Sequence, residues 1–190
     1  MKKLFLLTIA LVMTLSLAAC GGKTDTTAQS STTVPPSTTA AAATMVDVTF
    51  TQGISLKLPS DLTQADRNGV PVYINTATAD MVMAMDSPKD KPVSTWTKDD
   101  VLDMLKTKLN VEIKSFENDK KISGKDALIT TFTYTMSKDD ATKINAAFVI
   151  IEDGDTQYTV LFNYGQKDSS LAANLQACFD SISYEHAEEN

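Results

Sequence analysis

The segment AAFVIIEDGDTQYTVLFNYG, residues 146–165, decides the fold because it holds two strand-like runs joined by the clearest turn signal in the chain. β-Branched and aromatic residues dominate both runs, and Asp153-Gly154 separates them. Such a pair predicts a β-hairpin, since glycine readily adopts the positive φ that tight hairpin turns need. The acidic residues 152–155 could also suggest a calcium loop, but the later ligands and the bidentate glutamate are missing. We therefore interpret them as a turn.

Similar runs lie on both sides of this hairpin and predict further strands. Short connections between the last four indicate an antiparallel meander, and Gly53 and Asn68-Gly69 mark turns nearer the start. The predicted strands are residues 46–50, 54–58, 70–74, 79–85, 111–117, 126–136, 144–152 and 156–164.

A helix is predicted over residues 96–109, WTKDDVLDMLKTKL. Thr97 suits the N-cap, Asp100 completes a variant capping box, and Trp96 is placed to pack against Val101. The apolar stripe of this helix is expected to be Val101, Leu102, Leu105 and Leu109.

A second helix is predicted over residues 169–182, where apolar residues recur at helical spacing and include Cys178. We interpret Cys178 as a small buried hydrophobe, with a reactive thiol as the alternative. If Cys20 carries a lipid, Cys178 has no partner, so no internal disulfide is expected.

The order of these elements resembles the PsbP-like lipoproteins of bacteria, which have the Mog1/PsbP-like fold. The resemblance rests on GISLKLPSDLT, the capped central helix, the meander ending in AAFVIIEDGDTQYTVLFNYG, and LAANLQACFDSI. It covers about residues 46–184 and implies an α+β fold in which helices pack on an antiparallel sheet, an αβα sandwich. It also implies a binding or assembly factor, and it transfers no functional residue to this chain.

The N-terminus predicts a lipoprotein signal peptide over residues 1–19. Lys2 and Lys3 precede an apolar run of about fourteen residues, which suits a signal peptide and is shorter than a membrane span. The run ends in LAAC followed by two glycines, which resembles a lipobox with Cys20 as the acylated residue. An ordinary secretory signal with an incidental cysteine is the alternative. A lipid on Cys20 would anchor the chain to the outer side of the bacterial cell membrane, since two acyl chains hold stably where one is marginal.

Residues 20–45 predict a flexible linker, because Thr, Ala, Ser, Gly and Pro dominate them and cannot form a packed core. Whether the linker is glycosylated stays open. Residues 46–190 have the size of one domain. Without Lys2 and Lys3 the formal net charge falls from −7 to about −9. This balance argues against nucleic acid as a partner, since phosphate backbones attract cationic surfaces.

Catalytic signatures are missing from the sequence. The only histidine, His186, lies in the polar C-terminal tail, which argues against zinc sites built on histidine and against Ser-His or Cys-His nucleophiles. No phosphate-binding or dinucleotide-binding glycine motif is present either. We therefore expect a protein that is not an enzyme and has no cofactor.

Met81, Met83 and Met85 alternate in MVMAM, so a strand would place their three thioethers on one face. We interpret this row as packing in a core or apolar groove, which methionine fills readily. An exposed interaction strip and a Cu(I) site are the alternatives, since thioethers select this soft cation.

These observations predict a monomeric, lipid-anchored binding or assembly module that contacts an unidentified envelope protein at the membrane surface. A small-ligand or soft-metal carrier built on the methionine row is the alternative, and a hydrolase is a third, weaker hypothesis.

Overall fold

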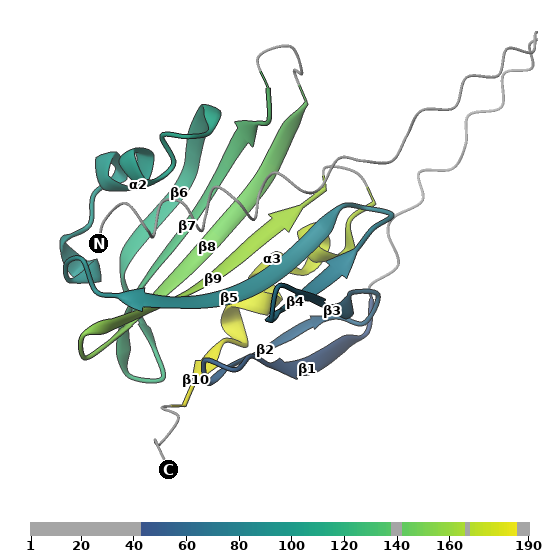
Figure 1. Ribbon diagram of the computed structural model, residues 1–190, viewed down its shortest axis with the longest axis horizontal. Helices are drawn as coiled ribbons and strands as arrows, with labels where there is room; N and C mark the ends of the chain where they lie inside the picture. The colour runs from purple at the N-terminus through teal and green to yellow at the C-terminus, as the bar shows by residue number, and fades with distance from the viewer. Residues whose placement is uncertain (1–42, 138–141, 166–167, 186–190) are drawn as a thin grey trace, which may run out of the picture.

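A computed structural model of the chain describes residues 43–137, 142–165 and 168–185. The predicted α+β architecture is confirmed, with antiparallel strands in two sheets and two α-helices among these residues (Figure 1). The strands are β1 (Met45–Thr49), β2 (Ile54–Pro59), β3 (Thr63–Arg67), β4 (Val70–Asn75), β5 (Asp80–Pro88), β6 (Leu109–Ile122), β7 (Lys125–Thr135), β8 (Lys143–Asp153), β9 (Thr156–Tyr164) and β10 (Ser183–Tyr184). The helices are the 3-10 turn η1 (Val93–Thr95), α2 (Lys98–Met104) and α3 (Ser170–Asp180).

The larger sheet has seven strands in the order β3-β4-β5-β9-β8-β7-β6, all antiparallel. The predicted meander supplies β6 to β9. Asp153 pairs with Thr156, and Gly154 between them has a φ of 58°, as the hairpin signal requires. Two strands were missed. β3, over Thr63–Arg67, has no apolar alternation and pairs with β4 through the Asn68-Gly69 turn. β10, over Ser183–Tyr184, has only two residues and pairs with β2.

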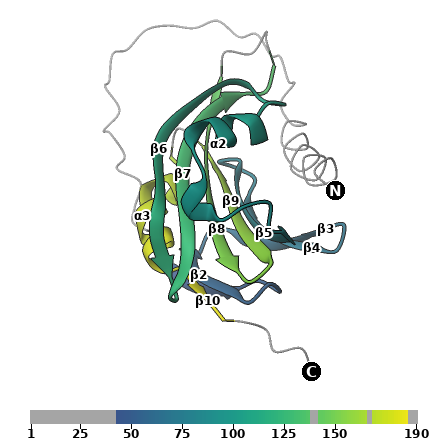
Figure 2. The ribbon, with the colours of Figure 1, turned by 90° about the vertical axis from the view of Figure 1, so that its left-hand side faces the viewer.

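Both faces of the large sheet are covered, which gives the layered arrangement seen in Figure 2. Along β8, Ala147, Val149 and Ile151 belong to a hydrophobic cluster shared with α3 and with the hairpin of β1 and β2. The intervening Phe148 and Ile150 belong to a second cluster, shared with η1 and α2. This alternation of two apolar faces is what a strand buried on both sides requires. The hairpin of β1 and β2 does not join the large sheet, whereas a sandwich built on a single sheet would include it. β1 and β2 form a separate three-stranded sheet with β10.

The first predicted helix begins as expected and ends earlier. Thr97 is the N-cap, and Thr97 and Asp100 form the predicted capping box. The helix ends at Met104, and Leu109 lies in β6 instead. Leu102 is within the helix but is 40% exposed, so neither leucine belongs to a buried helical stripe. Pairing with β7 from Leu109 onward outweighs the helical pattern of the sequence, because tertiary context overrides local propensity.

β6 is an edge strand of the large sheet, and its pairing with β7 is irregular at three places. The register shifts between Leu109 and Glu112, between Ile113 and Ser115, and between Glu117 and Lys120. Each shift adds one residue to β6, so the strand is bulged and bent along its length.

The predictions for the signal peptide, for Cys20 and for most of the linker concern residues 1–42, which lie outside the described residues, as does His186. The folded domain begins with β1 at Met45, next to the predicted boundary at residue 46. Within the described ranges, none of the helices has the length and apolar character needed to cross a bilayer.

Candidate binding groove

A groove of about 840 Å³ lies between the edge of the large sheet and α3. β6 and β7 form its floor and one wall, and α3 forms the other wall. Figure 2 shows α3 beside these two strands. The apolar side chains lining it are Ile122, Ile129, Ala172, Leu175, Phe179 and Ile182. This open site, lined by polar and apolar side chains, has room for a short stretch of polypeptide.

The sequence of α3 explains why the groove stays open. Leu171, Cys178 and Phe179 are buried and hold the helix against the sheet, and the Phe179 ring packs edge-on against Phe162 of β9 at 5.4 Å between centroids. On the groove side the first two turns carry Ala172 and Ala173, whose short side chains leave space next to β6.

Two buried serines at the N-terminus of α3 fix its position. Ser169, the N-cap, accepts from the Ala172 amide and donates to the Asp80 carboxylate at the start of β5, with oxygen separations of 2.8 and 2.9 Å. Ser170 donates to the Asp61 carboxylate at 2.6 Å. Gly165 packs closely here, because a Cβ at this position would lie 2.5 Å from the Thr78 carbonyl oxygen. The helix wall of the groove is therefore clamped to two distant parts of the chain.

The rim of the groove carries charges of both signs, with Glu117 and Asp180 against Lys120 and Lys121. Lys120 pairs with Glu117 at 2.7 Å. The hydrogen bond and charge of Glu117 raise the pKa of Lys120, and the nearby carboxylates Asp119 and Asp180 raise it further. The second lysine of the rim, Lys121, pairs with Asp126 at 2.6 Å. The two lysines and the two carboxylates that line the rim therefore balance each other in formal charge.

Hydroxyl groups line the sheet side of the groove. The Ser115 and Thr131 hydroxyl oxygens are 2.7 Å apart across β6 and β7. On the opposite face of β7, Thr130 donates to the Ser115 carbonyl at 2.7 Å. The floor therefore offers hydrogen-bonding groups beside its apolar side chains, as binding sites usually do.

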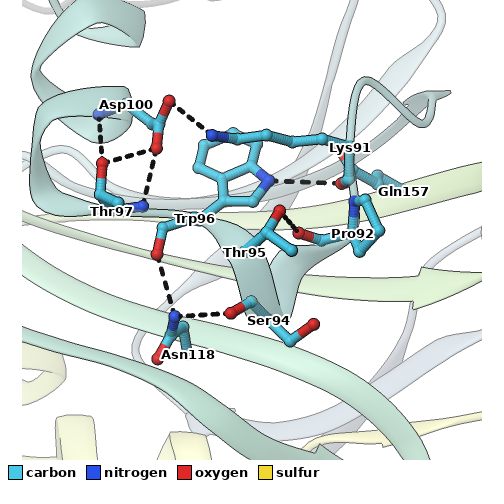
Figure 3. A network of polar contacts seen from close by, with 9 residues as sticks. All are labelled: Lys91, Pro92, Ser94, Thr95, Trp96, Thr97, Asp100, Asn118 and Gln157. Carbon is cyan, nitrogen blue, oxygen red and sulfur yellow. Dashed lines mark hydrogen bonds and ion pairs between the residues drawn. The ribbon is translucent and has the colours of Figure 1, made fainter.

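A polar network on the other face of the sheet holds η1 and α2 in place (Figure 3). The Lys91 ammonium pairs with Asp100 at 2.5 Å and lies 5.7 Å from the centre of the Trp96 ring. Gln157 of β9 donates to the Lys91 carbonyl, and Asn118 of β6 donates to the carbonyls of Ser94 and Trp96. Asn118 lies in the third irregularity of β6, so this bulge presents the amide that holds the segment.

Hydrogen bonds of Asp100 with Lys91 and Thr97 lower the pKa of its carboxyl to about 2. Together with the capping box, this network fixes the segment from Lys91 to Asp100 on the sheet. Its polar groups hold one another and the backbone of η1, and we interpret the network as structural.

Met81, Met83 and Met85 are buried in the cluster that includes Trp96 and Leu161, in agreement with the core interpretation. Their strand, β5, is buried on both faces, since Val82 and Ala84 between them belong to the other cluster. Met104 and Met136 pack against the same cluster from partly exposed positions.

The remaining sequence-predicted positions are structural where they are described. Cys178 is buried, and burial raises the pKa of its thiol to about 12, which keeps it protonated at neutral pH. Residues 152–155 are the end of β8 and its turn into β9. The described ranges contain no group of three or more His, Cys, Asp or Glu side chains arranged to hold a metal ion.

The groove itself was missed from the sequence, because its two walls come from segments far apart in the chain. Ala172-Ala173 on the exposed side of the predicted helix and the mixed charges of residues 117–121 were the only local signals.

No protein-family model and no curated protein sequence matches the chain. Among solved structures, the PsbP protein of the cyanobacterium Synechocystis sp. PCC 6803 (CyanoP) is similar over 89% of this chain and 99% of its own, with 14% identity and a TM-score of 0.54. LpqN of Mycobacterium tuberculosis, described as involved in cell envelope biogenesis, is similar over 74% of this chain and 90% of its own, with 13% identity and a TM-score of 0.48. The likeness to CyanoP extends over nearly the whole of that protein, and the fold of this chain is therefore PsbP-like.

Proposed function

We propose that this chain is a lipid-anchored, extracytoplasmic binding module that takes up a segment of a partner protein in the groove between β6 and α3. The observation that carries the proposal is the groove, which combines apolar side chains, hydroxyl groups and charges of both signs in one open site. The sequence adds that no histidine-based or nucleotide-binding chemistry accompanies it.

The anchor follows from the sequence features of Cys20 and supports the same proposal. A linker of about 25 residues has a root-mean-square reach of roughly 25 to 30 Å, so the domain would search for partners close to the membrane surface. Binding there is favoured because anchoring raises the effective concentration of both proteins.

Site-specific photo-cross-linking in the native membrane tests this function. A photoreactive residue replaces Ala173, which is exposed on the groove wall, and the matched control replaces Asp47, which is exposed on β1. We expect one discrete protein adduct from position 173 and none from position 47. Equal labelling at both positions would contradict a groove-based function.

The anchor is tested in the same cells with Cys20→Ser. We expect this variant to lose acylation and lipoprotein-type processing, so that no mature-sized chain appears in the detergent phase. Retention of the mature-sized variant in the detergent phase would contradict the lipobox interpretation.

A soft-metal or small-ligand carrier is the second candidate function. It is motivated by the five thioethers of Met81, Met83, Met85, Met104 and Met136, which gather in or against one cluster. Thioethers select Cu(I), whereas packing alone accounts equally for a buried methionine row.

A further inference from the structure

The hairpin of β3 and β4 turns through Asn68-Gly69, the only Asn-Gly pair in the chain. Arg67 pairs with Val70, so the turn has two residues, and both have a positive φ, 57° for Asn68 and 81° for Gly69. A two-residue hairpin loop with two positive φ angles is a type I′ turn. Both turn residues are exposed, and a Cβ built on Gly69 would meet no atom within 4 Å. Water therefore reaches this turn freely.

An asparagine that precedes glycine can lose its side-chain amide without an enzyme. The backbone nitrogen of the glycine gives up its proton and attacks the side-chain carbonyl carbon, Cγ. A new C–N bond closes a succinimide ring, and the C–N bond of the side-chain amide breaks, so that the amide group and a proton leave as ammonia. Water then opens either carbonyl of the ring and leaves aspartate or isoaspartate. Glycine favours the attack because it has no side chain that would obstruct it.

The closed turn opposes this reaction in two ways. In a type I′ turn the ψ of the first turn residue is about +30°. At this ψ the Gly69 nitrogen and the Asn68 side chain lie on opposite sides of the Cα–C bond, so the ring closes only after a rotation that opens the turn. In addition, the Asp66 carboxylate accepts from the Gly69 amide at 2.9 Å, which holds both the proton and the nitrogen in place.

The hairpin can nevertheless open while the rest of the domain stays folded. Among the described residues, β3 pairs with β4 and with no other strand. All five side chains of β3 are exposed or half-buried, and none is buried. An edge element with so little buried apolar surface opens locally at a much lower free energy than the core. The Gly69 nitrogen is therefore released from time to time.

We infer that Asn68 is a deamidation site that the β3–β4 hairpin protects, with the bond from Gly69 to Asp66 controlling how often the site becomes reactive. Isoaspartate at this position would add one carbon atom to the backbone of a two-residue turn. Arg67 and Val70 could then no longer pair in register, and β3 would stay detached from the sheet. This inference goes beyond the proposed function and does not depend on the groove.

The test incubates the purified full chain in detergent at neutral pH and constant temperature. Peptide mapping by mass spectrometry and labelling with isoaspartate methyltransferase follow the modification over time. A capped peptide with the sequence of residues 64–72 gives the rate without the hairpin. We expect Asn68 to be modified before every other asparagine of the chain, and at least about fivefold more slowly than in the peptide, because only the opened fraction reacts. A rate equal to that of the peptide, or earlier modification of other asparagines, would overturn the inference.

Three variants then test the role of Asp66. Asp66→Ala removes the acceptor, and we expect Asn68 to react roughly twofold to tenfold faster, as the loss of one hydrogen bond warrants. Asp66→Asn keeps an acceptor oxygen and should stay within about twofold of the unaltered chain. Asp86→Ala, an exposed position on β5, is the matched control and should leave the rate unchanged. The alanine change made in the capped peptide should also have little effect, because the peptide has no turn to hold.

Equal rates in Asp66→Ala and in the control, or the same acceleration by Asp66→Ala in the peptide, would overturn the protective role of Asp66. Hydrogen exchange of the aged chain tests the consequence for β3. We expect the backbone amides of β3 and β4 to lose protection in the modified fraction, and unchanged protection would overturn the detachment of β3. Melting temperatures followed by circular dichroism show that each variant is folded.

Discussion

Replacing Asp80 tests whether the clamp on α3 holds the groove wall in place. Asp80 is 2% exposed, and its carboxylate accepts from the Gly165 amide at 2.8 Å and from the Ser169 hydroxyl at 2.8 and 2.9 Å. Asp80→Ala leaves these two donors without their acceptor in a buried place. Each such group costs about 1 to 3 kcal/mol, so we expect a loss of roughly 2 to 6 kcal/mol in the free energy of unfolding.

Two further substitutions sharpen the Asp80 experiment. Asp80→Asn keeps one acceptor oxygen and should lose about half as much stability as Asp80→Ala. Asp86→Ala on the same strand is the control, because Asp86 is exposed, and its cost should stay within about 0.5 kcal/mol. Urea unfolding followed by the fluorescence of Trp96, the only tryptophan, and by circular dichroism gives the free energies. A loss below about 1 kcal/mol for Asp80→Ala would refute the clamp.

Three other predictions concern the opposite face of the sheet. The Asp100 carboxyl, whose pKa is lowered to about 2 from 3.8, stabilises the fold fully above pH 4, and this contribution is lost as the pH falls toward 2. Urea midpoints measured across that range should fall more steeply for the unaltered chain than for Asp100→Asn, and parallel curves would contradict the assignment. Met83→Ala should cost roughly 2 to 5 kcal/mol by urea unfolding and Met83→Leu less than about 1.5, because leucine keeps the volume. Cu(I) titration should show equal, weak uptake by the unaltered chain and by a variant with leucine at Met81, Met83 and Met85, whereas strong uptake lost in the variant would favour the carrier.

The sequence predicted the parts of the fold that local chemistry determines. The β8–β9 hairpin needed only a glycine with positive φ between two strand-forming runs, and the start of α2 needed only the side chains of Thr97 and Asp100. The predicted end of α2 was wrong because Leu109 pairs with Thr135 of β7, a segment far away in the sequence. β3 was missed because its polar residues form a strand only once β4 is beside them.

The groove could not be predicted from the sequence because its walls come from segments that are far apart in the chain. Lys120 and Asp180 lie sixty positions apart in the numbering, and their proximity depends on how α3 is clamped and how β6 bends. The methionine row could be placed on one face from its spacing alone, whereas its burial required the positions of η1 and α2 on the sheet.

The irregular edge of β6 has a consequence for crowding. Proteins held to one surface by lipid meet their own copies far more often than proteins in dilution, and a long, straight edge strand would then recruit the same strand of a neighbour. Three bulges interrupt the edge formed by β6, and charged side chains such as Lys114, Glu117 and Lys120 lie along it. Two copies cannot align their edges over more than a few residues. If the chain is anchored as proposed, strand pairing between copies through β6 would therefore be limited to a few residues beside the groove.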